Sequence, residues 1–151
     1  PKAERLYLES LSICREIGGD RQGESSSLTS LGIIAEKRGD FAEAERFYLE
    51  SLSIVREIGY RMGEAISLGN LGNIAAHRGN LAEAEQLHLE SLAIDREIGC
   101  REGEANSLIS LGNIASENGN MDESHRCYTE AVRIKREIGI PIDQWFIDNG
   151  Y

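Results

Sequence analysis

The sequence repeats itself about every 40 residues, and this period limits the possible folds more than any other feature. The tetrapeptide Arg-Glu-Ile-Gly occurs four times, at intervals of 41, 40 and 40 residues. Its arginines are Arg15, Arg56, Arg96 and Arg136. One extra residue, Gly19 or Asp20, accounts for the longer first interval. A period of about 20–50 residues indicates an array of stacked supersecondary units, each too small to bury its apolar face alone.

Helix stop and start signals recur in every unit. A glycine in the left-handed conformation ends a helix at low cost, and thirteen of the 16 glycines keep to the repeat. One set is expected to end the first helix of each unit: Gly39, Gly79 and Gly119. Each is followed by a good N-cap, with a glutamate three residues later at the capping-box spacing. The caps are Asp40, Asn80 and Asn120. A second set is expected to end the second helix: Gly18, Gly59, Gly99 and Gly139.

A third set of glycines falls in the middle of the first helix of each unit: Gly32, Gly72 and Gly112. A glycine in a helix interior costs about 1 kcal/mol relative to alanine. A cost repeated at one position needs a packing reason, and Gly72 lies on the apolar stripe between Leu71 and Ala75. We therefore expect these glycines to let the two helices of a unit approach closely, and a leucine at Gly72 to force them apart.

These units resemble the tetratricopeptide repeat. That motif places a bulky residue, Leu, Gly and a fourth core residue on the first helix, then a turn Gly, then small, aromatic and small residues on the second. The middle unit offers Leu68, Leu71, Gly72, Ala75, Gly79, Ala84, His88 and Ser91. The unit here has 40 residues instead of about 34, and it lacks the usual Pro after the second helix. Longer units of this kind are similar to those of kinesin light chain, spindle-orientation adaptors and prokaryotic signalling proteins.

The resemblance implies an all-α, right-handed superhelical solenoid of antiparallel helix pairs, with about seven long helices and a short C-terminal one. We predict a truncated unit over residues 1–18, full units over 19–58, 59–98 and 99–138, and a C-terminal cap over 139–151. By register the chain opens inside a second helix, which indicates a piece of a longer array. In the tail, Pro141 is expected to occupy the first position of a helix. Its apolar face, formed by Ile142, Trp145, Phe146 and Ile147, is expected to cover the last unit; a partner-binding tail is the alternative.

Composition excludes several classes of function. The formal net charge is −10, which disfavours nucleic acid and anionic membranes as partners. No run approaches the ~18 apolar residues of a membrane span. The three cysteines, Cys14, Cys100 and Cys127, lack metal-site spacing and indicate reduced thiols in a cytoplasmic protein. No residues have convergent spacing for catalysis or metal binding, so we expect neither an enzyme nor a cofactor.

Several chemically conspicuous residues have structural interpretations. His88 stands where other units have Tyr48 and Tyr128, which predicts an aromatic core position, and Cys127 also matches core residues. The four repeated arginines are interpreted as solvated partners of nearby glutamates, like Arg46 with Glu50 at i,i+4. The glutamates near the starts of the first helices are explained by the helix dipole. They are Glu24, Glu64 and Glu104.

The polar face of each first helix is expected to line a concave groove, because it lies opposite the apolar stripe at ~100° per residue. The candidate peptide-binding residues are Ile33, Glu36, Lys37, Asn70, Asn73, His77, Asn106, Ile109, Asn113 and Glu117. Asn73 and Asn113 are the sharpest candidates, because an amide both donates to and accepts from a peptide backbone. In the resembled family the residue after the core Gly often does this. The alternative is that they are only solvated, and Ile33 interrupts the series.

The expected partner is a protein or peptide. The family's clamp for terminal carboxylates uses Lys or Arg, but the matching positions hold Thr29, Gly69 and Ile109. With Glu36 and Glu117 in the groove, we expect a neutral or basic, partly apolar segment. The resemblance implies an interaction scaffold within a larger signalling or regulatory protein. The alternative is a structural module that self-assembles, for instance as a homodimer, through its exposed terminal helices.

Overall fold

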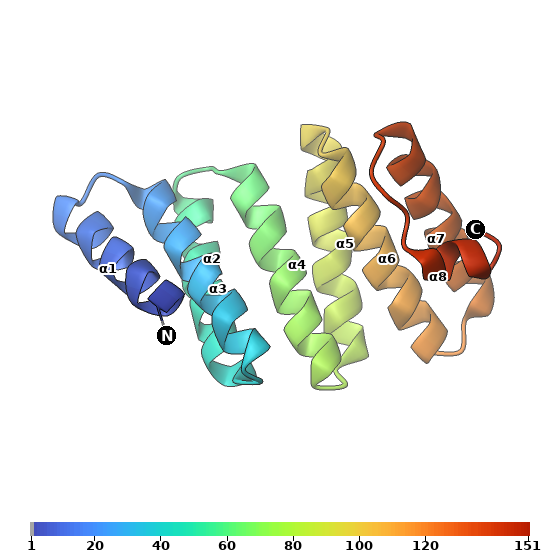
Figure 1. Cartoon of the computed structure of the whole chain (residues 1–151), viewed down its shortest axis with the longest axis horizontal. Helices are drawn as coiled ribbons and strands as arrows, with labels where there is room; N and C mark the ends of the chain where they lie inside the picture. The colour runs from blue at the N-terminus through green and yellow to red at the C-terminus, as the bar shows by residue number, and fades with distance from the viewer. Residues whose placement is uncertain (1) are drawn as a thin grey trace.

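Within residues 2–151, seven long helices follow one another along the longest axis of the molecule, and a short eighth helix lies over the seventh (Figure 1). The computed structural model describes residues 2–151, and Pro1 of the predicted truncated unit lies outside them. The helices are α1 (Lys2–Ile17), α2 (Arg21–Lys37), α3 (Phe41–Glu57), α4 (Arg61–His77), α5 (Leu81–Ile98), α6 (Arg101–Glu117), α7 (Met121–Glu137) and α8 (Gln144–Asp148). Residues 2–151 contain no strand, and none of their helices is long and apolar enough to cross a membrane. The predicted all-α solenoid, with seven long helices and one short one, is confirmed.

The helices pack mainly with their neighbours in the sequence, as a solenoid requires. The tightest partners are α2 with α3, α4 with α5, and α6 with α7, and each of these pairs then packs on the next. The first helices of the pairs also contact one another, α2 with α4 and α4 with α6. This closer approach puts α2, α4 and α6 on the inner side of the curve.

The turns follow the predicted signals at most positions. The glycines that end helices have positive φ, for example +78° at Gly39 and +71° at Gly99. The Asp40 carboxylate accepts a hydrogen bond from the Glu43 amide at 3.1 Å, which caps α3. Asn120 caps α7 in the same way. The prediction is wrong at Asn80, because its side-chain amide donates to the Glu83 carboxylate instead of accepting from the backbone.

A ring from α3, α5 and α7 packs directly against the mid-helix glycine of the preceding helix. A Cβ built on Gly32 would lie 2.4 Å from Cε1 of Tyr48, far inside van der Waals contact. Gly112 meets Tyr128 and Gly72 meets His88 in the same way, at 2.5 and 2.7 Å. The predicted close approach is confirmed, and so is the core placement of His88, which is 2% exposed.

The C-terminal tail differs in part from its prediction. Helix α8 begins at Gln144, so Pro141 is not its first residue. The Asp143 carboxylate accepts a hydrogen bond from the Trp145 amide at 2.9 Å and fixes the later start. Phe146 is buried against Tyr128 and Val132 of α7. A five-residue helix turns only one narrow face to its neighbour, so Trp145 and Ile147 stay about half exposed.

Ion pairs connect the helices where each second helix passes to the next first helix. Arg56 of α3 donates to Glu64 of α4 at 2.9 Å, and Arg61 joins Glu64 to Glu97 of α5. The same bridges recur as Arg15–Glu24–Arg21–Glu57 and as Arg96–Glu104–Arg101–Glu137. We call these three sets the ion-pair rim. Burial alone would raise the pKa of Glu64, but hydrogen bonds from Arg56 and Arg61 outweigh it and lower that pKa.

The rim bears on two interpretations. Glu24, Glu64 and Glu104 do more than face a helix dipole, because each is bonded to two arginines. Arg15, Arg56 and Arg96 are half-exposed partners of nearby glutamates, as predicted, although across the turn and not along one helix. Arg136 instead donates to the Tyr151 carbonyl at 2.8 Å. The i,i+4 pair predicted for Arg46 is wrong, since Arg46 lies 3.7 Å from Glu43 and not against Glu50.

The ring-on-glycine contact makes a matched pair of alanine substitutions informative. Gly32→Ala should lower the free energy of unfolding by about 1–3 kcal/mol, because the new Cβ overlaps the buried Tyr48 ring. Gly69→Ala, also within a helix, should raise it by up to ~1 kcal/mol, because its nearest neighbour is 3.7 Å away and alanine favours the helix. Urea denaturation of both variants checks this. Equal stability would contradict the packing role.

Replacement of His88 by tyrosine should change how stability depends on pH. Burial lowers the pKa of His88 to about 4, whereas an unfolded histidine titrates near 6.5. The unfolded chain therefore binds the extra proton first, and the folded state loses stability as pH falls from about 6.5 towards 4. This loss disappears in His88→Tyr. The free energy of unfolding of the variant, relative to that of the parent protein, should therefore rise by about 1–2 kcal/mol between pH 7 and pH 5. The exposed His125→Gln is the control, and a constant difference across this range would refute the prediction.

Candidate functional site

Three adjoining hollows lie along the inner face formed by α2, α4 and α6. The central hollow has a volume of about 280 Å³. Its lining is Glu36, Asn73, Ala76, His77, His88, Ser110, Asn113, Ile114 and Glu117. A second hollow of about 630 Å³ shares Asn73, His88 and Ser110 with it and continues past Asn70 and Asn106. A third of about 260 Å³, around Ile33 and Lys37, shares Glu36 and His77. We call these three together the inner groove.

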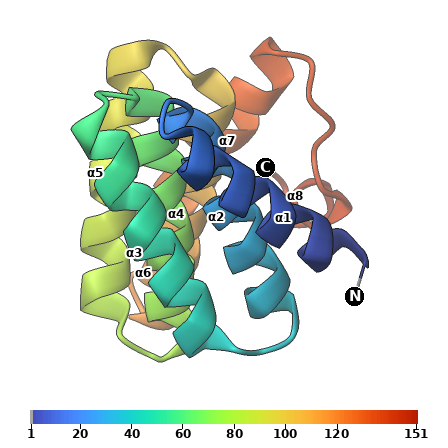
Figure 2. The ribbon, with the colours of Figure 1, turned by 90° about the vertical axis from the view of Figure 1, so that its left-hand side faces the viewer.

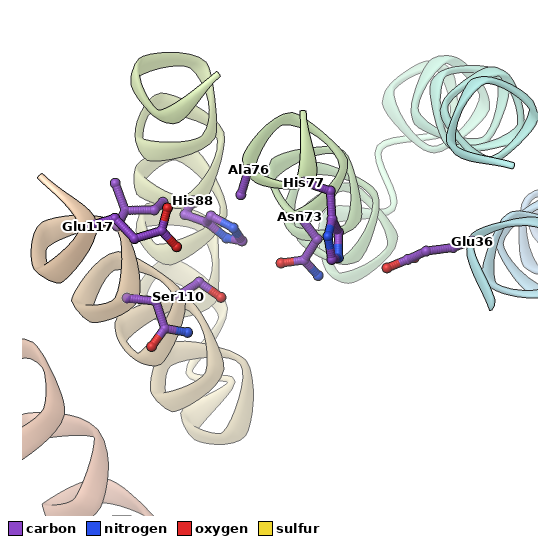
Figure 3. Close-up of a pocket in the computed structure, with 9 residues that line it drawn as sticks. Glu36, Asn73, Ala76, His77, His88, Ser110 and Glu117 are labelled. Atoms are coloured by element: carbon purple, nitrogen blue, oxygen red, sulfur yellow. The ribbon is translucent and has the colours of Figure 1, made fainter. Parts of the chain in front are cut away.

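The structure brings nine of the ten predicted binding residues into the inner groove. The exception is Ile109, which is partly buried against the cluster of Tyr128, Val132 and Phe146. In the central hollow, side chains from four helices approach one another (Figure 3). Glu117 and Ser110 of α6 lie on one side, Asn73 and His77 of α4 lie on the other, and His88 of α5 lies between them.

The two asparagines predicted to grip a peptide have different surroundings. The Tyr128 hydroxyl donates to Oδ1 of Asn113 at 2.6 Å, which orients that amide and leaves its NH₂ group for a ligand. Asn73 has no such bond, because the shorter His88 replaces the tyrosine. In the preceding unit the Tyr48 hydroxyl donates instead to Glu36, at 2.8 Å, and Ile33 occupies the asparagine position. The position after the mid-helix glycine therefore presents an apolar side chain at Ile33, a free amide at Asn73 and an oriented amide at Asn113.

The inner groove carries unneutralised negative charge. Glu36 and Glu117 form no ion pair with a lysine or arginine anywhere in residues 2–151, unlike the glutamates of the ion-pair rim. The cationic residue on the groove is Lys37, at the edge of the third hollow. His77 stacks on Phe41 with ring centroids 5.0 Å apart, and its ring lies where the central hollow meets the third hollow. A ligand entering the central hollow meets two carboxylates, amides and a hydroxyl.

Sequence reasoning missed part of this lining. His88 was assigned to the core alone, but its ring also lines the central hollow. Ala76 and Ser110 lie on the predicted groove face of their helices, whereas Ile114, a core residue, was missed as part of the lining. A signal was available in the repeat, because His88 and Ala76 replace the Tyr48 and Glu36 that bond to each other one unit earlier. Within the described residues, no group of three or more histidine, cysteine or acidic side chains is placed to hold a metal ion.

Comparison with known proteins identifies the family. The family model described as tetratricopeptide repeat matches residues 1–57 and 63–137. Among solved structures, the fold is similar to the crystal structure of BtubC (BKLC) from P. vanneervenii, with a TM-score of 0.78 and 20% sequence identity. The match covers 93% of this chain and 58% of that one, so this chain spans less than two thirds of that protein's length. A search of the curated proteins finds no match. The chain belongs to the tetratricopeptide repeat family.

Proposed function

We propose that this chain is a scaffold that binds an extended or helical peptide segment in the inner groove, as a module of a larger signalling or regulatory protein. The family supports the general part, because tetratricopeptide arrays are protein-interaction modules and are generally not enzymes. The observation that carries the finer part is the continuity of the groove. Nine predicted residues on three successive first helices line hollows that share their walls.

The spacing of the helices suits an extended peptide. Packed helices lie about 8–10 Å apart, and an extended chain advances ~3.3 Å per residue. Asn73 and Asn113 occupy the same position on neighbouring first helices, so they would meet peptide groups about three residues apart. The NH₂ group of Asn113 can donate to a peptide carbonyl, and the Asn73 amide can both donate and accept.

The composition of the groove favours a neutral or basic, partly apolar segment. Glu36 and Glu117 repel acidic groups, and the net charge of −10 extends this effect over the molecule. Ile33 and Ile66 supply apolar contact area at the adjoining hollows. For the same electrostatic reason we propose neither nucleic acid nor an anionic membrane as partner. The free, buried Cys14 and Cys127 support a reducing, cytoplasmic location, and we propose no cofactor.

The double substitution Asn73→Ala/Asn113→Ala tests whether the two amides bind the peptide backbone, as distinct from non-specific attraction between the peptide and the groove. Peptides are selected from a phage-displayed dodecapeptide library and measured by calorimetry. The double variant should bind them about tenfold to a hundredfold more weakly, because two hydrogen bonds at ~1 kcal/mol or more are lost. Gln86→Ala, an exposed amide on α5, is the matched control. Selection of acidic C-terminal peptides that bind the double variant with unchanged affinity would sink the proposal.

A second candidate function is self-assembly through α1, the helix nearest the viewer in Figure 2. Leu6 and Ile13 are 52% and 48% exposed, whereas the equivalent Phe47 and Ile54 are 7% and 3% exposed. Tyr7 is also exposed, whereas the equivalent Tyr48 is fully buried. An apolar stripe of this kind suits a second copy of the chain, because single scattered apolar residues would need no partner but a contiguous face does.

Sedimentation over a range of concentrations tests this second function. Self-assembly predicts a dimer or filament that grows with concentration and is lost in Ile13→Glu, which places a charge in the middle of the stripe. Leu8→Glu is the control, because Leu8 is 48% exposed and its equivalent Leu49 is 51% exposed, so neither belongs to the stripe. A monomer at every concentration, or equal effects of the two variants, would remove the self-assembly function.

A further inference from the structure

We propose that the central hollow is a side-chain pocket that receives an arginine of the bound segment. This inference rests on the proposed function and gives it a specificity. The pocket is particular to the middle unit, and it arises where two residues of the repeat are both replaced by smaller ones.

Comparison of the three units shows why the hollow exists. In the preceding unit, Tyr48 extends past Gly32 and its hydroxyl bonds to Glu36, so ring and carboxylate fill the space between the helices. In the following unit the Tyr128 hydroxyl reaches Asn113. The middle unit has His88 and Ala76 at the positions of Tyr48 and Glu36, and both line the space that results.

Most groups that line the hollow are polar, Ala76 and Ile114 being apolar, and one of the polar groups has an unused hydrogen-bonding atom. Nδ1 of His88 is buried and has no hydrogen-bond partner within residues 2–151. The Glu117 carboxylate faces the His88 ring from α6, and the Asn73 side chain faces it from α4 (Figure 3). Glu117 forms no ion pair in the described chain. Glu117 is exposed, and its carboxylate attracts a cation that enters the hollow.

An arginine side chain matches the hydrogen-bond acceptors of the central hollow better than other side chains do. Its guanidinium has five N–H donors in a plane, and the hollow offers acceptors in the Glu117 carboxylate and the Asn73 amide oxygen. His88, which lines the hollow, is neutral at pH 7 because burial lowers its pKa to about 4, so it does not repel a guanidinium. An acidic side chain would face Glu36 and Glu117, and an apolar one would leave the polar lining without partners.

Blocked tripeptides with one variable central residue test the pocket. The probes are acetyl-Ala-Arg-Ala-amide and its citrulline counterpart, which has the same shape and no charge. In ¹⁵N NMR titrations, the arginine probe should shift the amides of Asn73, Ser110 and Glu117 and should bind about tenfold more tightly than the citrulline probe. This ratio corresponds to about 1.4 kcal/mol.

Two variants and a control complete the experiment. His88→Tyr should fold, because Tyr48 and Tyr128 fit the same position against Gly32 and Gly112, and it should lose the arginine preference because its ring and hydroxyl fill the hollow. Glu117→Gln should keep the hollow and weaken arginine binding about tenfold. Glu85→Gln removes the same charge from an exposed position on α5 outside the inner groove and should leave binding unchanged.

The outcomes separate this inference from the proposed function. Equal binding of the arginine and citrulline probes, or unchanged arginine binding in His88→Tyr, would overturn the pocket. If dodecapeptides still need Asn73 and Asn113 in that case, the groove function stands without it. If the arginine probe behaves as expected but no peptide depends on the two asparagines, the pocket stands and the backbone-gripping groove fails.

Discussion

The contact between a ring and a glycine holds each helix pair together, and the rest of the structure depends on it. A side chain larger than hydrogen at Gly32, Gly72 or Gly112 would push the second helix away from the first. The rings of Tyr48, His88 and Tyr128 would then lose their cover. The apolar surface that one pair presents to the next, such as Val55 and Leu68, has its shape only when these pairs are closed. Close packing inside the pair is therefore a condition for stacking between pairs.

The same position that closes each pair also varies the chemistry of the inner groove. Its tyrosine hydroxyls reach through the helix pair and bind Glu36 in one unit and Asn113 in another. A histidine at this position keeps the packing and withdraws the hydroxyl. The fold tolerates this exchange because the ring, and not its tip, meets the glycine. In the middle unit, core and groove thus share His88, and the exchange at this position changes the lining of the groove while the ring–glycine contact remains.

The fold could be predicted from the sequence because its signals are local and repeated. Turn glycines, N-caps and mid-helix glycines each appear three or four times, so one exception such as Asn80 does not change the conclusion. Interactions between distant residues could not be predicted in this way. The bridge from Arg61 to Glu97 depends on how far α5 leans over α4, which no local pattern records. The start of α8 at Gln144 was missed because an Asp143 cap competed with Pro141. The sequence predicts His88 only as a core residue, and no local pattern shows that a buried ring also lines the groove.

The ion-pair rim has a consequence for how arrays of this kind can lengthen or shorten. Its long bridges join residues 36 positions apart in every unit: Arg21 with Glu57, Arg61 with Glu97, and Arg101 with Glu137. A duplicated segment of 40 residues therefore brings both partners of one such bridge and presents the correct arginine to the unit that follows. A deletion of one period rejoins equivalent residues in the same way. Insertion or deletion of whole 40-residue periods therefore keeps an arginine opposite each rim glutamate. An insertion or deletion of any other length leaves charged side chains without their partners at the junction.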